Sequence, residues 1–163
     1  MSAPSERLAA LGLSLPSVAP PLAAYVPAVR LGDLIYSSGQ LPLEGGQLIA
    51  TGKVGSQVSV DDAARCARAA ALNGLAAIAG VSGGLDAIQQ IVKVVVFVAC
   101  APDFTAQPQV GNGASELLGE IFGEAGRHAR SAVGVASLPL DAPVEIELIV
   151  RAKSTPTIQP VSA

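Results

Sequence analysis

The chain has 163 residues, of which 50% are hydrophobic and 14% are charged, and its formal net charge is −3. This composition excludes a disordered chain, because disordered chains combine low hydrophobicity with high net charge. Only 3% of the residues are aromatic. Nucleic acid is therefore not expected as a partner, since phosphate binding needs a positive surface and base stacking needs aromatic rings. The length predicts a single domain.

The sequence also gives no indication of a membrane protein or of a secreted one. The longest uninterrupted apolar run, Val94 to Ala101, has eight residues, whereas a spanning helix needs about 20. An acid, Glu6, precedes the first short apolar stretch, whereas a secretory signal begins with basic residues. Cys66 and Cys100 form no CxxC pair. We expect a cytoplasmic protein with buried thiols and no membrane partner.

The first third of the chain predicts short elements separated by turns. Residues 5–13 have the pattern of a short helix, and prolines then interrupt the chain up to residue 27. A strand is expected over 34–38. The segments 41–43 and 47–50 flank Glu44-Gly45-Gly46, which is typical of a hairpin.

A long helix is expected to begin after Ser59 and to be ended by Gly80 and the loop Ser82-Gly83-Gly84. Ser59 and Asp62 are spaced as in a capping box, with Asp in place of the usual Glu. Asp61 and Arg65 are four residues apart, so they are expected to pair on the exposed side of this helix.

The second half predicts three strands and one helix. Strands are expected over 91–100, 132–138 and 144–151, with a turn at 139–143. A helix is expected over 112–125 because its apolar residues recur at intervals of three and four. The order of elements predicts an α+β domain in which two helices pack on one face of a mixed sheet.

One strand implies a partner. Val94, Val96 and Val98 point to one face of the sheet, while Val95 and Phe97 point to the other. A strand that is apolar on both faces is buried on both. Two helices cover only one face of such a sheet, so we expect a second copy of the chain to cover the other.

Most motifs with a chemical function do not fit this pattern of elements. The run Gly80-Val81-Ser82-Gly83-Gly84 matches G-x-S-x-G, but a helix precedes it and a strand follows it, the reverse of a nucleophile elbow. His128 is the one histidine, and two distant cysteines accompany it. That set does not supply a tetrahedral metal site, so no metal is expected.

Two charged positions remain open to more than one interpretation. Arg127 and His128 suit the C-terminal end of a helix, where positive charge complements the helix dipole. Arg130 lies where the next strand begins, and a fixed arginine there can present its planar fork to a carboxylate. Glu145 and Glu147 are either a solvated strand face or carboxylates that position water.

Several strings occur in a characteristic order along the chain. They are Leu31-Gly32-Asp33-Leu34-Ile35-Tyr36-Ser37-Ser38-Gly39-Gln40-Leu41-Pro42, Asn73, 91–98, Arg130-Ser131-Ala132-Val133-Gly134-Val135-Ala136, Leu138-Pro139 and Val144-Glu145-Ile146-Glu147. Together they resemble the reactive intermediate deaminase family, also called RidA/YjgF and often labelled "endoribonuclease L-PSP". The resemblance covers residues 23–153 and indicates a longer, divergent branch. Residues 1–22 would then be an N-terminal extension and 154–163 a polar tail.

The resemblance implies a chorismate-mutase-like fold and a homotrimer whose sheets form a central barrel, with sites in the clefts between subunits. It places the carboxylate-binding arginine of the family at Arg130 and the water-positioning glutamate at Glu145. The Ser-Gly pair that lines the cleft falls on Ser38 and Gly39. The other substrate-binding positions fall on Tyr25, Asn112 and Ala132.

Departures from the family pattern are of two kinds: the missing cysteine and the longer N-terminus bear on activity rather than on fold, and the other two bear on the placing of Tyr25 and Asn112. Many deaminating members have a cysteine where this chain has Ala132. Ala23-Ala24 replaces the Gly-Pro before the cleft tyrosine, and the stretch 105–111 carries extra residues.

The activity implied by the resemblance is hydrolytic deamination of reactive 2-imino and 2-enamino acids to 2-keto acids and ammonia, with no metal or cofactor. An alternative is a non-catalytic trimer that binds small carboxylates in the same cleft. RNA cleavage or inhibition of translation is a third function of this class, but the net charge and the few aromatic residues disfavour it.

Overall fold

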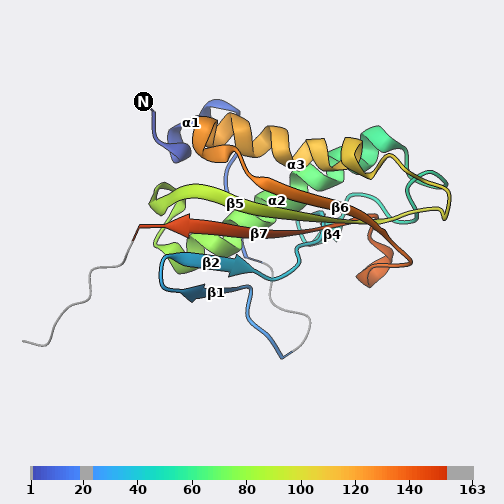
Figure 1. The fold of residues 1–163 in the computed structure, drawn as a ribbon, viewed down its shortest axis with the longest axis horizontal. Helices are drawn as coiled ribbons and strands as arrows, with labels where there is room; N and C mark the ends of the chain where they lie inside the picture. The colour runs from blue at the N-terminus through green and yellow to red at the C-terminus, as the bar shows by residue number, and fades with distance from the viewer. Residues whose placement is uncertain (1, 19–23, 154–163) are drawn as a thin grey trace, which may run out of the picture.

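The computed structural model describes residues 2–18 and 24–153 (Figure 1). The α-helices are α1 (Pro4–Ala10), α2 (Val60–Ser82) and α3 (Gln107–Phe122). The strands are β1 (Ala28–Leu31), β2 (Leu34–Ser37), β3 (Leu43–Glu44), β4 (Gln47–Leu48), β5 (Ile88–Ala99), β6 (Ala129–Val135) and β7 (Val144–Ala152). Short 3-10 helices are η1 (Leu85–Ala87), η2 (Gly123–Gly126) and η3 (Pro139–Asp141). Within these residues, no helix is long and apolar enough to cross a membrane.

The main sheet is mixed, as the sequence predicts. Its five strands lie in the order β1-β2-β7-β5-β6, and β3 and β4 form a separate hairpin. β5 and β6 pair in parallel, and α3 is the crossover between them. The other pairs in the sheet are antiparallel. Helices α2 and α3 lie on the same face of the sheet (Figure 1), so the predicted α+β architecture is confirmed.

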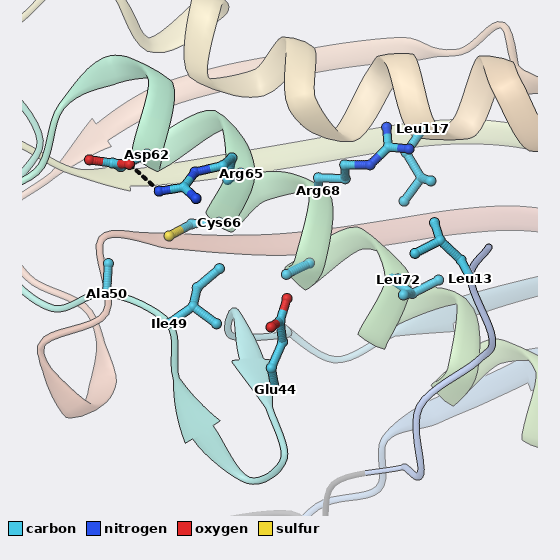
Figure 2. A pocket seen from close by; sticks show the side chains of 11 residues that line it. Leu13, Glu44, Ile49, Ala50, Asp62, Arg65, Cys66, Arg68, Leu72 and Leu117 are labelled. Carbon is cyan, nitrogen blue, oxygen red and sulfur yellow. Dashed lines mark hydrogen bonds and ion pairs between the residues drawn. The ribbon is translucent and has the colours of Figure 1, made fainter. Parts of the chain in front are cut away.

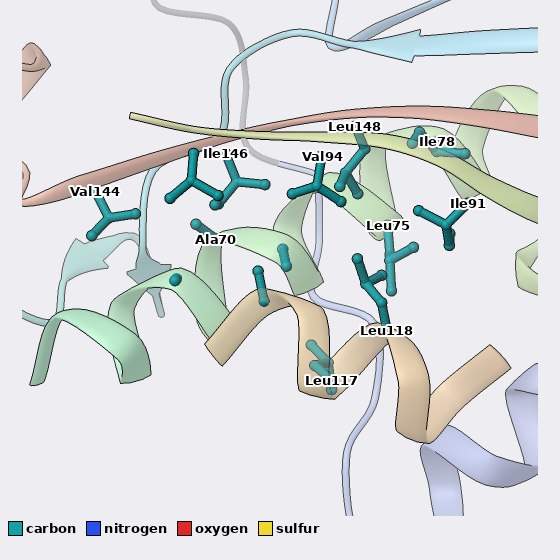
Figure 3. Packing of buried hydrophobic residues seen from close by; sticks show 14 of the residues in the cluster. Ala70, Leu75, Ile78, Ile91, Val94, Leu117, Leu118, Val144, Ile146 and Leu148 are labelled. Atoms are coloured by element: carbon teal, nitrogen blue, oxygen red, sulfur yellow. The ribbon is translucent and has the colours of Figure 1, made fainter. Parts of the chain in front are cut away.

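The hydrophobic core lies between the sheet and the helix pair (Figure 3). In β7 every second residue is buried from Val144 to Val150, while Glu145, Glu147 and Ile149 are partly exposed. Val94, Val96 and Val98 of β5 are fully buried on the same face. This alternation assigns each strand residue either to the helix-covered face or to the opposite face of the sheet.

The opposite face of the sheet, here called the open face, carries apolar side chains that no described element covers. Val29 of β1 is 54% exposed and Val133 of β6 is 46% exposed. Phe97 and Val95 of β5 are partly exposed on the same face. A solvated sheet face normally alternates to polar residues, so this surface fits burial against another copy of the chain.

Helix α3 begins earlier than the sequence indicates. It starts at Gln107 rather than at residue 112, and Pro108 occupies its first turn, where the missing N–H of proline leaves no helical hydrogen bond unmade. The helix ends at Phe122 because Gly123 has a positive φ of 60°. Residues 107–111 therefore form the start of α3.

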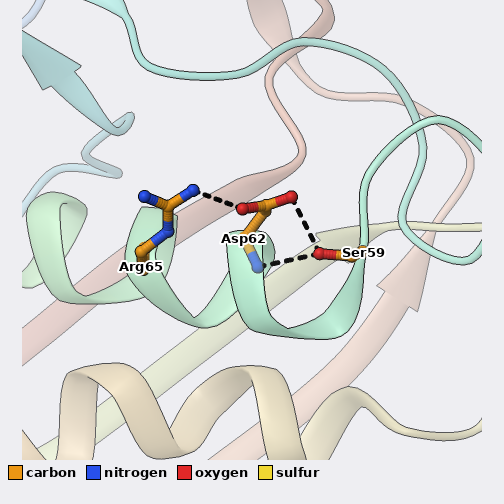
Figure 4. Close-up of polar contacts among 3 residues, drawn as sticks. All are labelled: Ser59, Asp62 and Arg65. Carbon is orange, nitrogen blue, oxygen red and sulfur yellow. Dashed lines mark hydrogen bonds and ion pairs between the residues drawn. The ribbon is translucent and has the colours of Figure 1, made fainter.

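Two further predictions need correction. The strand expected over 132–138 lies at Ala129–Val135, since it follows the register of β5. Arg65 pairs with Asp62 rather than with Asp61 (Figure 4). Asp62 is also the partner of the N-cap, because Ser59 Oγ accepts from Asp62 N at 3.1 Å and donates to Asp62 Oδ2 at 2.8 Å. These contacts, first from Arg65 and then from Ser59, lower the pKa of Asp62.

The N-terminal residues are part of the folded body. Leu8 of α1 is buried. Ser5 donates from its backbone N to Asp86 Oδ1 at 2.8 Å and from its Oγ to Asp86 Oδ2 at 2.7 Å. Helix α1 is thereby attached to η1, which directly precedes β5. The predicted tail, residues 154–163, lies outside the described residues.

Candidate functional site

Arg130 is held on the helix-covered face of the sheet. It pairs in register with Val94, which is fully buried beneath the helices. Its Nη1 donates to Asn112 Oδ1 at 3.0 Å and to Ser115 Oγ at 3.0 Å, and its Nη2 donates to Pro108 O at 3.2 Å. All three acceptors belong to α3, so the guanidinium is fixed by one helix.

The close approach of Arg130 to α3 depends on a glycine. A Cβ added at Gly111 would lie 3.2 Å from Nη1 and 3.3 Å from Cζ of Arg130. The guanidinium therefore lies directly over the backbone of the helix. Beside it is a recess of about 590 Å³, lined by Ser115, Gly119, Gly123, Gly126, Arg127, His128 and Arg130. Such a recess next to a fixed cation can admit a small anion.

Glu145 lies on the open face of the sheet. It pairs in register with Phe97, and the buried residues on either side of it in β7 point to the helices. Burial raises the pKa of the Glu145 carboxyl, and the neighbouring Glu147 carboxylate raises it further. A carboxylate that is poorly solvated and close to a like charge is a stronger base than an ordinary glutamate.

Residues 38–40 run alongside Glu145. Gln40 N donates to Ile146 O at 2.8 Å, and Ile146 N donates to Gln40 O at 3.0 Å. A Cβ at Gly39 would overlap Glu145 Oε1, so the glutamate occupies the space that any other residue at position 39 would fill. This contact explains in physical terms why a glycine stands beside the glutamate.

Ser38 connects this group to the segment that carries Tyr25. Its Oγ donates to Val26 O at 2.6 Å, and its backbone N donates to Pro27 O at 2.8 Å. Tyr25, one residue before Val26, is 45% exposed. Four of the sequence-predicted site residues therefore lie in one part of the molecule. They are Tyr25, Ser38, Gly39 and Glu145.

The structure divides the predicted site residues into two groups. Arg130 and Asn112 contact each other on the helix-covered face, and Ala132, in register with Val96, lies on that face as well. Glu145 lies on the other face. One protomer therefore does not bring Arg130 and Glu145 together across its own sheet, and we call the two groups the arginine half-site and the glutamate half-site.

Sequence analysis missed two members of the arginine half-site. Ser115 accepts a hydrogen bond from Arg130 and is also 3.0 Å from His128 Nε2, while His128 Nδ1 is 2.6 Å from Gly126 O. The interpretation of His128 as a residue at the C-terminal end of the helix expected over 112–125 is wrong, because α3 ends at Phe122. A usable signal was the spacing of His128 and Arg130, which places both side chains on the same side of an extended chain.

A second cavity lies between α2 and the β3–β4 hairpin (Figure 2). It has a volume of about 480 Å³ and contains none of the predicted site residues. Both of its arginines are already paired, Arg65 with Asp62 and Arg68 with Glu120. Burial raises the pKa of the Cys66 thiol in its wall to about 11. This thiol is therefore protonated at neutral pH and is not a nucleophile.

Asn73 has a structural role, and the described residues offer no set of metal ligands. Asn73, part of the family pattern, donates from Nδ2 to Leu41 O at 2.9 Å and to Leu43 O at 3.0 Å. It therefore fastens the start of the hairpin to α2. Among residues 2–18 and 24–153, no group of three or more His, Cys, Asp or Glu side chains could hold a metal ion.

Two solved structures and one relative of known sequence are similar to this chain over most of its length. A structure from Agrobacterium tumefaciens, of a protein with unknown function, is 46% identical, covers 92% of both chains and has a TM-score of 0.83. A "2-iminobutanoate/2-iminopropanoate deaminase" from Dermatophagoides farinae is 32% identical over 85% of this chain and 93% of its own. The structure of Escherichia coli TdcF with bound serine is 27% identical, covers 82% of this chain and 91% of its own, and has a TM-score of 0.60.

The family evidence spans almost the whole described chain. Residues 5–151 match the family described as "YjgF/chorismate_mutase-like, putative endoribonuclease". The match includes both half-sites and, apart from the first residue of α1 and the last residue of β7, all of helix α1 and the mixed sheet. Together with the 32% identity to the Dermatophagoides farinae deaminase, it shows that this chain belongs to the YjgF/RidA family.

Proposed function

We propose that the protein is a homotrimer that hydrolyses 2-imino acids, in equilibrium with their 2-enamino forms, to 2-keto acids and ammonia. The observation that carries the proposal is the pair of half-sites. One holds a guanidinium fixed by three acceptors of α3, and the other holds a carboxylate whose pKa is raised. The deaminase name of the relative from Dermatophagoides farinae supports the same reaction.

The open face of the sheet supports the trimer. Its apolar side chains would be covered if three sheets faced one another around a common axis, as in a barrel. In such an assembly β6, the edge strand that carries Arg130, would lie close to a neighbouring subunit. The glutamate half-site of that neighbour would complete the cleft. This arrangement overcomes the separation of Arg130 and Glu145 on opposite faces of one sheet.

Arg130 would bind the α-carboxylate of the imino acid. The guanidinium is a planar fork that matches both carboxylate oxygens, and it remains charged at any working pH. Small-carboxylate binding also fits the relative TdcF, whose structure contains serine. The carboxylate would thus fix the position of the C=N carbon.

Glu145 of the neighbouring subunit would hold and deprotonate the attacking water. The water oxygen bonds to the C=N carbon, its proton passes to Glu145, and the C=N bond becomes a C–N single bond. Glu145 then returns this proton to the nitrogen, which gives a carbinolamine with an OH and an NH2 group on the same carbon. The remaining hydroxyl proton passes to the nitrogen through Glu145, the C–N bond breaks, ammonia leaves, and the carbonyl of the 2-keto acid forms. Water is consumed and no electrons are transferred, so the reaction needs no redox cofactor.

The decisive experiment compares two neighbouring glutamates. Glu145→Gln keeps the shape of the side chain but removes its basicity, so kcat should fall by about 10²–10⁴-fold. Binding of the product 2-oxobutanoate should persist, since Arg130 still holds the carboxylate. Glu147→Gln is the matched control on the same strand face; it removes only the second cause of the raised pKa of Glu145, so the rate should change far less than in Glu145→Gln. Release of 2-keto acid from enzymatically generated 2-iminobutanoate measures the rate.

Arg130 provides the complementary test. Charge-assisted hydrogen bonds contribute about 1.5–3 kcal/mol each, so Arg130→Ala should weaken 2-oxobutanoate binding by about a hundredfold or more. Arg130→Lys should rescue little, because a point charge does not reproduce the fork. Unchanged affinity in both variants would place the ligand elsewhere.

Binding without turnover is the other outcome that this experiment separates. A wild-type protein that binds 2-oxobutanoate but hydrolyses no imino acid would be a carboxylate-binding trimer. Ala132 would then be the first position to change, because many deaminating relatives have a cysteine there. Ala132→Cys should restore turnover if the thiol is what the cleft lacks.

A further inference from the structure

A continuous chain of hydrogen bonds leads from the backbone to Arg130. His128 Nδ1 lies 2.6 Å from Gly126 O, His128 Nε2 lies 3.0 Å from Ser115 Oγ, and Arg130 Nη1 donates to the same Oγ at 3.0 Å. Ser115 and His128 both line the recess beside Arg130. Their side chains are hydrogen-bonded to each other, and Ser115 Oγ accepts directly from the guanidinium, so both are placed to act on Arg130.

The chemistry of the partner atoms determines which atom donates in each of these three hydrogen bonds. A carbonyl oxygen only accepts, so His128 Nδ1 must carry a proton and donate to Gly126 O. Arg130 only donates, so Ser115 Oγ must accept from it. In neutral His128 the Nε2 atom is then an acceptor, and it takes the hydroxyl proton of Ser115. This leaves the lone pairs of Ser115 directed at the guanidinium.

The same accounting identifies the free part of Arg130. The guanidinium has five N–H donors. Asn112 and Ser115 take both donors of Nη1, and Pro108 O takes one donor of Nη2. Among the partners that the structure describes, the Nε–H and the second Nη2–H therefore remain for a ligand. These nitrogens are the adjacent pair that binds a carboxylate from the side of the guanidinium.

We propose that Ser115 and His128 are positioning residues, which orient Arg130 so that its Nε–Nη2 edge receives the carboxylate of the substrate. This role rests on the proposed function and adds two residues to its site. Ser115 restrains Nη1, and His128 restrains Ser115 by accepting its hydroxyl proton. Without that acceptor the hydroxyl is free to turn to a backbone carbonyl of its own helix, as serine side chains in helices do.

The test uses 2-oxobutanoate as the probe and calorimetry as the measurement. Ser115→Ala and His128→Ala should each weaken binding about tenfold. This is the size of effect expected when a residue that orients a ligand-binding side chain is removed. The double variant should bind about as well as Ser115→Ala alone, since both residues act through one Oγ. Ser115→Thr keeps the hydroxyl and should restore most of the affinity. Glu116→Ala, at the next and exposed position of α3, is the control and should change nothing.

Kinetics separate positioning from a structural defect. Loss of carboxylate binding affects the ground state and the transition state alike, so KM should rise about tenfold while kcat and the melting temperature stay nearly constant. Equal affinity and KM in the wild type, Ser115→Ala, His128→Ala and the double variant would overturn the positioning role. So would a fall in melting temperature that accounts for the loss of binding.

A spectroscopic measurement keeps this inference distinct from the proposed function. The Nε–H resonance of Arg130, identified by its loss in Arg130→Lys, should be sharp in the free wild-type protein and broadened by exchange in Ser115→Ala. Failure of the wild type to bind 2-oxobutanoate would contradict the proposed function alone. An Arg130 resonance that is unchanged in Ser115→Ala would contradict the positioning role, whatever the protein binds.

Discussion

The two half-sites differ in how much of their geometry one protomer supplies. The guanidinium of Arg130 is held by three acceptors on α3. The carboxylate of Glu145, within the described residues, accepts no hydrogen bond and lies instead against Gly39, poorly solvated and close to Glu147. The binding cation is thus preorganised, while the base is left reactive. Preorganised charge contributes to binding at little further cost, whereas a base must remain free to take a proton.

The comparison predicts that two inactive variants can complement each other. If each cleft takes Arg130 from one subunit and Glu145 from its neighbour, co-expressed Arg130→Ala and Glu145→Gln chains form some intact clefts. With equal amounts and random assembly, about a quarter of the clefts should be intact. Turnover by the purified mixed trimers should therefore rise from near zero to about a quarter of the wild-type rate.

The control for complementation is the double variant carrying both substitutions, mixed with wild-type chains of a different tag. It tests whether the assembly itself exchanges subunits during expression. Mixed trimers that contain both single variants yet remain inactive would show that the two residues act within one subunit. The separation of the half-sites between subunits would then be wrong.

The arginine half-site depends on the close packing of α3 against α2. A Cβ at Gly113 would overlap the carbonyl oxygen of Ala64 in α2, so Gly113→Ala should push the helices apart. Overpacking of this kind costs about 3 kcal/mol, which corresponds to a fall in melting temperature of about 10 °C. Carboxylate binding should weaken as well, because α3 supplies every acceptor that holds Arg130.

Gly119 gives the matched control for this substitution. It lies in the same helix, and a Cβ there would meet nothing within 4 Å. Gly119→Ala should therefore stabilise the protein by about 0.5–1 kcal/mol, the usual gain in helix propensity. Equal melting temperatures for both variants would mean that the two helices tolerate a wider separation.

The glutamate half-site is tested by a single added methyl group. Gly39→Ala places a Cβ on Glu145 Oε1, so the carboxylate must move while Arg130 stays in place. We expect kcat to fall at least tenfold, because general-base geometry is strict, with little change in 2-oxobutanoate affinity. Gly80→Ala on α2, where a Cβ meets nothing within 4 Å, should leave both quantities unchanged. Weaker binding with a normal rate would reverse the roles of the half-sites.

Hydrophobic periodicity predicted the elements with the longest regular patterns. It did not predict where α3 begins or which aspartate pairs with Arg65. The alternation of β7 and the apolar stripe of α2 follow directly from burial, so the sequence predicts both. The start of α3 at Gln107 was missed because Pro108 looks like a break but fits a first turn. The spacings of Asp61 and Asp62 from Arg65 both suit a helical ion pair. In the structure Arg65 pairs with Asp62, whose carboxylate also accepts a hydrogen bond from the N-cap residue Ser59.

The resemblance proposes a set of candidate site residues, but the sequence does not predict how they are arranged in space. The resemblance places Arg130, Glu145 and Gly39 at the family positions, yet no spacing along the chain reveals that two of them face opposite sides of the sheet. The face follows from the register of β5 with β6 and β7. Ser115 and His128 come from elements that meet only in three dimensions, so their contact with Arg130 also required the structure.

The smallest expected effect concerns stability, and its sign follows from the raised pKa of Glu145. Burial, and then the charge of Glu147, raises that pKa in the folded protein. The folded state therefore holds the proton more tightly than the unfolded chain, and ionisation of Glu145 costs stability as the pH rises through the folded pKa. Glu145→Gln has no such ionisation. Its melting temperature should exceed that of the wild type at pH 7, and the difference should vanish near pH 4, where the wild-type carboxyl is also protonated. A variant less stable than the wild type at pH 7 would mean that the Glu145 carboxylate gains a favourable partner in the assembled trimer. The glutamate half-site would then be as firmly held as the arginine one, and the contrast between them would fail.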